Sequence, residues 1–340
     1  MRVGIVIPTY NRLAYLRRAL SSALAQTHQD IEVLVLDNGS TDGTRGYLAE
    51  LRDPRVRVIL NERNLGAVGS IGKGISGFEG RVPWCTVLCD DDALDPSFLG
   101  KALGAAGRRD ATAVVHGHRV LVDGEGRTLR DAAPAPAEET ALGYLAARRD
   151  RERETWLTGI LFRMEAYRRI GGYPAFATGM ATDDAFLFSL ALLDRIVSEQ
   201  EALARITIHP GAESESPAEA EQHFRALAEF GEYVVRAASE LGGMPPLVIG
   251  ELREITREYV TRLDSEIWIR AVNALCRKQG EEAREEVRRL CVIAADGRFP
   301  FTPRVRAGAR ILRFAGWYPE RFGPYRFFWK RVERRLSGTR

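Results

Sequence analysis

Short apolar runs alternate with longer amphipathic segments over the first 120 residues. Four of the runs are rich in β-branched residues and too short for helices: residues 3–8, 31–37, 56–60 and 84–90. Between them lie three segments with helical spacing of apolar residues, the third loosened by glycines: residues 13–26, 41–52 and 66–78. This alternation predicts an α/β fold with a Rossmann-like, mostly parallel sheet of buried strands flanked by helices.

A polar segment follows each of these predicted strands. The four segments are PTYNR at 8–12, DNGSTDGT at 37–44, NERNLG at 61–66 and DDDALDP at 90–96. The carboxyl ends of parallel strands meet at one edge of a sheet, where α/β proteins bind their ligands. We therefore expect a single site at this edge.

The rest of the chain divides at a polar break near residues 212–217. Before the break we expect a strand with a hairpin, a surface loop, a strand with a short helix ended by two glycines, and a helix followed by a strand: residues 111–127, 133–139, 158–174 and 181–209. After Pro217 the spacing is helical throughout. The sequence predicts a catalytic domain at 1–212 and a helical C-terminal region at 217–340.

The composition excludes several classes of protein but does not identify one. With 45% hydrophobic and 28% charged residues, the chain resembles an ordinary globular protein. No apolar run reaches the roughly 18 residues needed to span a bilayer, and the N-terminus resembles a strand rather than a secretory signal, so we expect a cytoplasmic protein. A net charge of +3 is too small to indicate a nucleic-acid partner. Cys85, Cys89, Cys276 and Cys291 are too dispersed for a zinc site and are expected to be buried free thiols.

The last 43 residues, 298–340, combine twelve Lys and Arg residues with two Glu and ten aromatic residues. Such a tail suits peripheral contact with an anionic membrane at the inner face. It equally suits packing on the catalytic domain or on a second subunit in a homo-oligomer. The first alternative fits a lipid-linked acceptor.

Asp90, Asp91 and Asp92 follow an apolar strand. Adjacent carboxylates repel one another unless a cation or solvent relieves them. The first and third point roughly the same way, as suits a Mg²⁺ or Mn²⁺ ion that also binds phosphate. The alternative is a solvated acidic turn that caps the next helix, although Asp95 is placed to cap it alone.

Other strand-end residues have a functional and a structural interpretation. Asp37 is either a turn residue or, because Ser40 and Asp42 are better caps, free to bind a base edge. Tyr10 and Asn11 are placed to stack on and bond to that base, or the aromatic ring covers the core. Asn64 and Lys73 flank a glycine-rich helix start that favours anions, although such a lysine is commonly solvated.

Three further residues lie later in the chain. Asp183 and Asp184 open a helix; Thr182 or Asp183 is a plausible cap, which leaves Asp184 without that duty. His209 ends a strand and is either a ligand or an ordinary surface residue.

Read together, six segments resemble the inverting, non-processive family 2 glycosyltransferases of the GT-A fold. The segments are VIPTYNR, VLDNGSTDGT, NLGAVGSIGKG, LCDDDALDPSFL, GGYP and TDDAFLFSLAL, and the resemblance covers residues 1 to about 210. It implies a nucleoside-diphosphate sugar donor (UDP, dTDP or GDP) and a glycan, lipid-linked or small-molecule acceptor.

The resemblance also implies roles for single residues. Pro8, Thr9, Tyr10 and Asp37 correspond to the base pocket, and Asn64 and Lys73 to further donor contacts. Asp90 corresponds to the ribose contact and Asp92 to the metal ligand, whereas Asp91 stays on the donor side without a defined role. Asp184 corresponds to the general base, and His209 to a residue that holds the metal or the diphosphate. The acceptor side is expected at Trp156, Thr158, Gly159 and Asp183, although Trp156 also fits a core or interface position.

The chain departs from the family pattern in three places. Ser70 and Gly72 stand where asparagines are common, and Thr207 stands where an arginine is common. The Gln-x-x-Arg-Trp motif of processive synthases is absent from the sequence. Two other classes remain open: a non-catalytic homologue that binds nucleotide sugars, and a sugar nucleotidyltransferase, which needs a glycine-rich loop where PTYNR stands.

Overall fold

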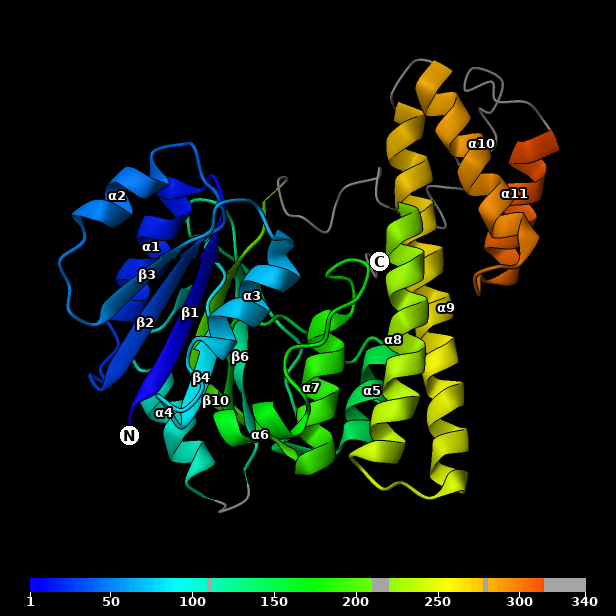
Figure 1. The fold of residues 1–340 in the computed structure, drawn as a ribbon. Helices are drawn as coiled ribbons and strands as arrows, with labels where there is room; N and C mark the ends of the chain where they lie inside the picture. Colours follow the sequence, from blue (N-terminus) through cyan, green and yellow to red (C-terminus); the bar gives the residue numbers. More distant parts are fainter. Residues whose placement is uncertain (109–111, 210–219, 278–280, 315–340) are drawn as a thin grey trace.

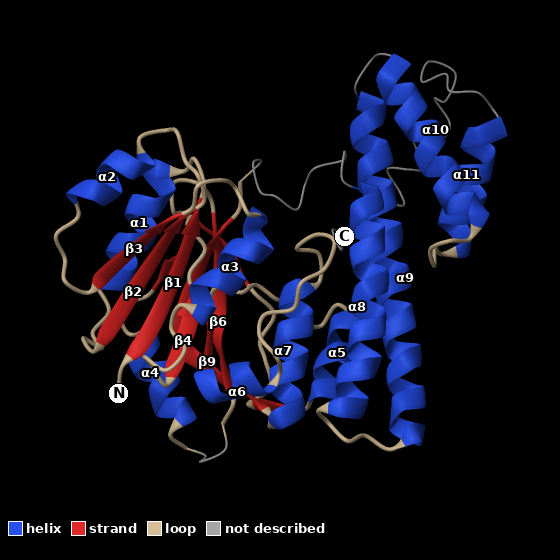
Figure 2. Cartoon of the chain, in the orientation of Figure 1, coloured by secondary structure: helices blue, strands red, loops and turns tan. Residues whose placement is uncertain are grey.

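A large twisted sheet with helices on both faces forms one part of the molecule, and long helices stand beside it (Figure 1 and Figure 2). The computed structural model describes residues 1–108, 112–209, 220–277 and 281–314. The predicted α/β architecture with a helical C-terminal region is confirmed. No helix within these ranges is both long and apolar enough to span a membrane.

The strands carry the order β3-β2-β1-β4-β9-β6-β10-β5, with β7 on β6 and β8 on β10. Their bounds are β1 (Val3–Thr9), β2 (Ile31–Asp37), β3 (Val56–Leu60), β4 (Trp84–Val87), β5 (Ala93–Leu94), β6 (Val114–Val122), β7 (Thr128–Asp131), β8 (Glu138–Glu139), β9 (Ile160–Arg163) and β10 (Ile196–Thr207). Strands β3, β2, β1 and β4 are parallel, and β6 is parallel to β10. Strand β9 runs antiparallel to both neighbours and joins the two parallel halves.

The helices follow the predicted pattern closely. Their bounds are α1 (Leu13–Leu24), α2 (Thr44–Glu50), α3 (Gly66–Ser76), α4 (Phe98–Ala106), α5 (Ala141–Arg149), α6 (Met164–Arg169), α7 (Thr182–Leu193), α8 (Ala220–Glu240), α9 (Pro246–Arg277), α10 (Glu281–Asp296) and α11 (Pro303–Phe314). The sequence did not indicate α5, and α11 lies in the segment expected to be a basic tail. The remainder of that tail, residues 315–340, lies outside the described residues.

Strand β3 corrects one expectation. It was predicted to be buried, but most of its residues are only partly buried and Leu60 is 52% exposed. The strand is rich in apolar, β-branched residues, but it lies at the end of the sheet, where it has one strand neighbour. A short apolar run therefore does not distinguish a central strand from an edge strand.

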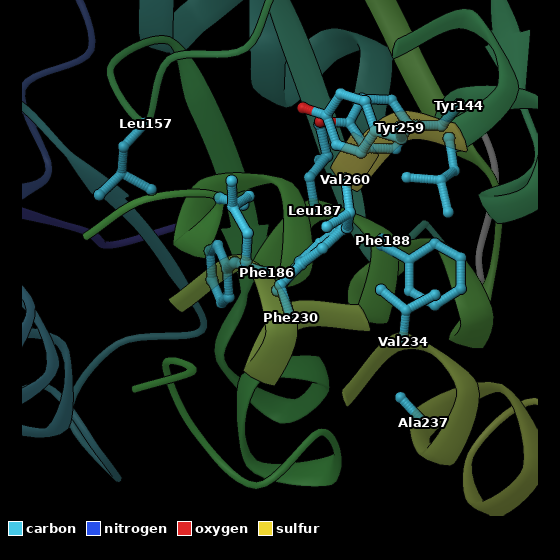
Figure 3. Packing of buried hydrophobic residues seen from close by; sticks show 14 of the residues in the cluster. Tyr144, Leu157, Phe186, Leu187, Phe188, Phe230, Val234, Ala237, Tyr259 and Val260 are labelled. Atoms are coloured by element: carbon cyan, nitrogen blue, oxygen red, sulfur yellow. The ribbon is translucent and has the colours of Figure 1, made fainter. Parts of the chain in front are cut away.

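Helix α7 is apolar on nearly every side because it is enclosed on nearly every side. Residues 184–191 are all buried, and the Phe162 and Phe186 rings meet edge to face at 5.0 Å. Figure 3 shows Phe186, Phe188, Phe230 and Val234 in one apolar layer between α7 and α8. A helix without a polar face belongs between two layers of structure.

One hydrophobic cluster runs from the sheet through α7 into α8, α9, α10 and α11. A second cluster lies on the opposite face of the sheet, under α1 and α4. The expected boundary at 212–217 falls within residues 210–219, which are outside the described residues. The division into two domains therefore stays a prediction, with continuous packing between the regions on either side.

Candidate functional site

The carboxyl ends of β1 and β4 bring the first predicted site residues together. Thr9 ends β1, and its hydroxyl donates a hydrogen bond of 2.7 Å to Oδ2 of Asp90. Arg12 Nη1 lies 3.3 Å from Asp90 Oδ1 and 2.8 Å from Asp91 Oδ2. Burial raises the pKa of Asp90 to about 6, although Thr9 and Arg12 favour its charged form.

Asp91 and Asp92 are held from the other side by the end of β10. The Thr207 backbone N–H donates to Asp92 Oδ1 at 2.9 Å. His209 Nε2 lies 3.1 Å from Asp91 Oδ2, and its ring stacks on Tyr15 at 5.2 Å. Thr207 therefore fixes the aspartate run through its backbone N–H and through its hydroxyl, which donates to the Asp91 backbone oxygen.

This group has the chemistry of a divalent-cation site. Cys89, Asp91 and Asp92 each offer one ligand atom, and these atoms lie within 4.8 Å of one another. Burial and the neighbouring Asp91 raise the pKa of Asp92 to about 8. A buried carboxylate whose ionisation is this unfavourable fits a site where a cation supplies the missing positive charge. Cys89 differs from the plain core thiol expected, because its sulfur faces this group, whereas Cys85 is a buried free thiol as predicted.

Asp37 ends β2 in a fully buried position and is not free of partners. Arg45 Nε donates to its Oδ2 at 2.8 Å, and the Ser40 backbone N–H donates to its Oδ1 at 3.1 Å. The Ser40 contact agrees with the interpretation of Asp37 as a turn residue, and Arg45 is a partner that the sequence did not indicate. Arg45, on the helix that follows, could not be assigned from spacing, because the pairing depends on how α2 returns to the sheet.

Side chains from β2, β3 and α3 form a connected amide network beside Asp37. Asn38 Nδ2 donates to Asn64 Oδ1 at 2.6 Å, and Asn61 Nδ2 donates to Asn38 Oδ1 at 3.1 Å. Lys73 Nζ donates to Asn61 Oδ1 at 2.5 Å. Asn64 and Lys73 thus lie at the same edge as Asp37, as expected, and Asn38 and Asn61 are members that the sequence did not single out.

Tyr10 and Asn11 form the rim above this network. Asn11 has a left-handed backbone (φ 52°), and its Oδ1 accepts the Thr41 backbone N–H at 2.7 Å. Tyr10 is 44% exposed, so its ring is not part of the core. Pro8 pairs with Leu36 within the sheet one residue before Thr9.

The predicted acceptor segment is held by a buried arginine. Arg119 of β6 donates to the backbone oxygens of Trp156 and Thr158 at 3.1 and 3.2 Å. Burial lowers the pKa of Arg119 to about 9. The Thr158 hydroxyl accepts the Cys89 N–H at 3.0 Å and hydrogen-bonds to Asp92. Segment 156–159 therefore lines the aspartate run directly.

Position 159 requires a glycine, because the backbone there lies close to Ala204 and Arg119. Its φ is +89°, and a Cβ there would meet Ala204 at 3.0 Å and Arg119 Nε at 3.1 Å. Its carbonyl accepts the Gly117 N–H at 2.8 Å. Trp156, by contrast, is only partly buried.

The two acids that open α7 face different surroundings. The Tyr173 hydroxyl donates to Asp183 Oδ1 at 2.6 Å, and the Leu157 backbone also hydrogen-bonds to this carboxylate. Burial raises the pKa of Asp183 to about 6, and its side chain remains partly exposed.

Asp184, the predicted base, is instead enclosed by donors from α5 and α9. Tyr144 and Tyr259 donate to it through their hydroxyls at 2.6 and 2.7 Å, and Arg148 Nε donates at 2.7 Å. Although burial opposes ionisation, Arg148 and these hydrogen bonds hold its pKa below the usual value. Arg148 and the two tyrosines occupy both oxygens of Asp184.

The predicted cap of α7 is also wrong. The cap position is Ala181 in a left-handed conformation, without a side-chain hydrogen bond. Neither Thr182 nor Asp183 caps the helix. Asp183 is therefore not committed to a structural role at the helix end.

Comparisons with known proteins identify the family. A model of glycosyl transferase family 2 matches residues 4–171. An uncharacterized glycosyltransferase of Nostoc sp. is 28% identical over 241 residues, which is 68% of this chain and 72% of that protein. The succinoglycan biosynthesis protein ExoO of Rhizobium meliloti is 38% identical over 128 residues, which is 38% of this chain and 36% of that protein. The match to ExoO thus covers about a third of that relative.

Solved structures share the fold at low sequence identity. S. aureus TarS in complex with UDP-GlcNAc superposes with a TM-score of 0.62 and 17% identity over 92% of this chain and 88% of that one. The mannosyltransferase PcManGT of Pyrobaculum calidifontis, in complex with GDP-Man and Mn²⁺, superposes with a TM-score of 0.54 and 15% identity. This match covers 92% of this chain and 86% of that one. With the family match, the strand-end site and the shared fold, this chain is a family 2 glycosyltransferase of the GT-A type.

Proposed function

We propose that the enzyme is a metal-dependent, inverting glycosyltransferase that moves a sugar from a nucleoside-diphosphate donor to an acceptor hydroxyl. Polysaccharide or related glycoconjugate biosynthesis is the proposed setting, since ExoO and a putative teichuronic acid glycosyltransferase of Bacillus subtilis carry such names. TarS and PcManGT support a nucleotide-sugar donor by the ligands named in their complexes.

The nucleoside is proposed to bind along the carboxyl ends of β1 and β2. Tyr10 offers an exposed ring for stacking, while Asn64 and Lys73 offer polar groups near the start of α3. Asp37 is proposed to act there together with Arg45, because the ion pair between them fixes the orientation of the Asp37 carboxylate. Asp90, paired with Thr9 and Arg12, stands next to them as the ribose contact.

Asp91 and Asp92 are the proposed holders of Mg²⁺ or Mn²⁺, with His209 fixing Asp91. A bound divalent ion supplies charge stabilisation for the departing nucleoside diphosphate. Asp92 must lose its proton to ligate, and its raised pKa predicts metal binding that weakens as the pH falls below about 8.

Asp183 replaces Asp184 as the proposed general base. The observation that carries this assignment is the contrast at the first turn of α7: Asp184 is buried and pairs with Arg148, whereas the side chain of Asp183 is partly exposed. An acceptor hydroxyl on the far side of the sugar ring loses its proton to Asp183 as its oxygen bonds the anomeric carbon. The bond to the diphosphate breaks in the same step, which inverts that carbon.

The test is a thermal-shift panel of UDP-, dTDP- and GDP-sugars with Mg²⁺ or Mn²⁺, followed by slow hydrolysis of the donor that binds. We expect one nucleotide class to raise the melting temperature only with metal, and the ¹H NMR signal of the released sugar to show the inverted anomer first. In Asp92→Ala the metal-dependent shift should vanish, while Asp95→Ala keeps it. A shift in Asp92→Ala that still responds to metal contradicts the metal site, and a binder that never releases sugar favours a non-catalytic homologue.

A further inference from the structure

Arg119 of β6 carries a buried positive charge that no contacting acid of the described residues balances. Its side chain is 1% exposed, and its guanidinium hydrogen-bonds to three backbone oxygens and to the ring of His116. Arg153, which is 2% exposed, instead pairs with Glu139 at 3.0 Å. A buried charge without such a partner is unfavourable, so packing alone does not account for Arg119.

The hydrogen bonds of Arg119 converge on the segment of residues 156–159. Nη2 donates to the Trp156 oxygen at 3.1 Å, and Nε donates to the Thr158 oxygen at 3.2 Å. Nη1 donates at 2.8 Å to the oxygen of Gly117 on its own strand. Because the guanidinium is planar and presents its donors in a rigid fork, it fixes the two oxygens of the segment relative to β6.

The same segment binds two acids of the proposed active site. The Thr158 hydroxyl hydrogen-bonds to Asp92 and accepts the Cys89 N–H at 3.0 Å. The Leu157 backbone N–H donates to Asp183. The backbone oxygens of the segment thus bind the arginine of β6, whereas its hydroxyl and N–H groups bind the proposed metal ligand and the proposed base.

We propose that Arg119 is a positioning residue that sets, through this backbone segment, the orientation of the Asp92 and Asp183 carboxylates. Arg119 acts through the segment and donates no hydrogen bond to either acid. The inference rests on the proposed function in treating Asp92 as a metal ligand and Asp183 as the base. Groups that hydrogen-bond to metal ligands commonly contribute about 10- to 100-fold to metal affinity, and the Thr158 hydroxyl is such a group.

The charge of Arg119 and its hydrogen bonds have opposite effects on a bound cation. Burial lowers the pKa of Arg119 to about 9, and Asp92 is among the acids that oppose this shift, so the two charges interact. A positive charge at that range repels Mn²⁺, and removing the charge alone should strengthen metal binding. Losing the hydrogen bonds that hold the segment should weaken metal binding. The sign of the change therefore separates the two roles.

Mn²⁺ titrations of the full chain with UDP present, followed by electron paramagnetic resonance of the free ion, test this. Arg119→Met should weaken Mn²⁺ binding about 10- to 100-fold. Arg119→Lys keeps the charge but replaces the fork with one ammonium on a flexible stem, so it should weaken binding about tenfold. Arg153→Met removes an equally buried arginine that holds Glu139, and should lower the melting temperature without changing Mn²⁺ affinity. Wild-type or tighter binding in Arg119→Met overturns the proposal, and so does wild-type binding in Arg119→Lys, which serves alone if Arg119→Met does not fold.

A double-variant cycle tests whether Arg119 acts through Thr158. Thr158→Val removes only the hydroxyl that contacts Asp92, and should weaken Mn²⁺ binding by about the same factor as Arg119→Lys. Because both changes remove the same contact, the double variant should bind Mn²⁺ about as weakly as either single variant. Losses that multiply in the double variant, or wild-type affinity in Thr158→Val, would contradict the proposed route through the segment.

Hydrogen exchange distinguishes failure of this inference from failure of the proposed function. The amides of Cys89 and Leu157 donate to Thr158 and Asp183, and in Arg119→Lys they should exchange faster relative to other amides of the sheet, with or without metal. A wild type that binds no Mn²⁺, with this faster exchange in the variant, contradicts the metal proposal alone. Equal Mn²⁺ affinity and equal exchange in wild type and Arg119→Lys contradict the positioning role alone.

Discussion

Buried aspartates occur in two neighbouring regions with opposite surroundings. At the sheet edge, Asp90 and Asp92 have raised pKa values, about 6 and about 8, because burial outweighs their partners. At the first turn of α7, Asp184 is equally enclosed, yet Arg148 and two tyrosines hold its pKa below the usual value. Burial alone therefore does not set the pKa of these carboxylates. Asp92 accepts hydrogen bonds from Thr158 and the Thr207 N–H and is suited to bind a cation, whereas the charge of Asp184 is already compensated by Arg148.

Among the variants proposed here, Asp183→Asn is expected to have the largest effect on activity. Asp183→Asn should lower kcat by roughly 10² to 10⁴ without weakening the donor, because a positioned base contributes that factor. The wild-type rate should fall below about pH 6, since the pKa of Asp183 is raised to about 6 and a base must be deprotonated. Steady-state rates over pH 5–9 and donor thermal shifts measure both.

Asp184→Asn is the matched variant for this test. It is expected to lower the melting temperature, with a smaller loss of kcat than Asp183→Asn. If Asp184→Asn loses the greater share of kcat while its melting temperature is unchanged, the roles of the two acids are reversed.

Arg148→Met removes the counter-charge from the second region. Leaving Asp184 buried without it should reduce the free energy of unfolding by about 3–5 kcal/mol, as found for broken buried ion pairs. Urea denaturation measures the loss, and Arg149→Met, whose arginine pairs with its neighbour Asp150, should change little. A loss no larger in Arg148→Met than in Arg149→Met would show that the pair does not stabilise the fold.

The same pair predicts a pH dependence of stability. The folded pKa of Asp184 is lowered, so its contribution is present above the unfolded value near 3.8 and is lost as the pH falls through the folded pKa. Arg148→Met should abolish this acid-sensitive part of the unfolding free energy. An identical acid limb in wild type and Arg148→Met would contradict the assignment.

Tyr259→Phe removes the hydrogen bond from α9 to Asp184 and should cost less stability than Arg148→Met. The lost hydrogen bond ends on a charged group, so we expect about 1.5–3 kcal/mol less unfolding free energy. Tyr233→Phe removes a hydroxyl 2.8 Å from the neutral Ser189 and should cost only about 0.5–1.5 kcal/mol. Equal losses would mean that the charge of Asp184 is unimportant to the contact.

Asp264 on α9 is a third buried acid, and burial alone shifts its pKa. Both of its oxygens lack a hydrogen-bond partner among the described residues, and burial raises its pKa to about 8. Because the folded pKa exceeds the unfolded one, stability should fall as the pH rises between about 4 and about 8, at most about 1.4 kcal/mol per pH unit. Asp264→Asn should lessen this slope in melting curves recorded from pH 5.5 to 8, whereas an unchanged slope would mean that Asp264 titrates normally.

Much of the fold followed from periodicity. The order of β1, α1, β2, α2, β3, α3 and β4 is local information, because each element is a short segment with its own apolar spacing. The strand-end rule then placed Thr9, Asp37, Asn64 and Asp90 at one edge. That inference required no knowledge of packing, because parallel strands must end on the same side.

The roles of the acids were decided by contacts between distant segments. Arg148 and Tyr259 lie 36 and 75 residues from Asp184, so no motif around α7 indicates that its second acid is already paired. Arg12 and Arg45 were likewise overlooked, because spacing does not reveal which carboxylate a flexible side chain reaches. Successive helical residues point about 100° apart, and Asp183 and Asp184 accept hydrogen bonds from different side chains.

The sequence by itself determined the α/β class, the helical C-terminal region and the edge of the sheet that carries the site, because periodicity and strand polarity are properties of the chain. Only the tertiary structure showed that Asp184 is held by α5 and α9. The physical reason is that a carboxylate's pKa and accessibility depend on charges and burial around it, and these are set by packing across long sequence separations.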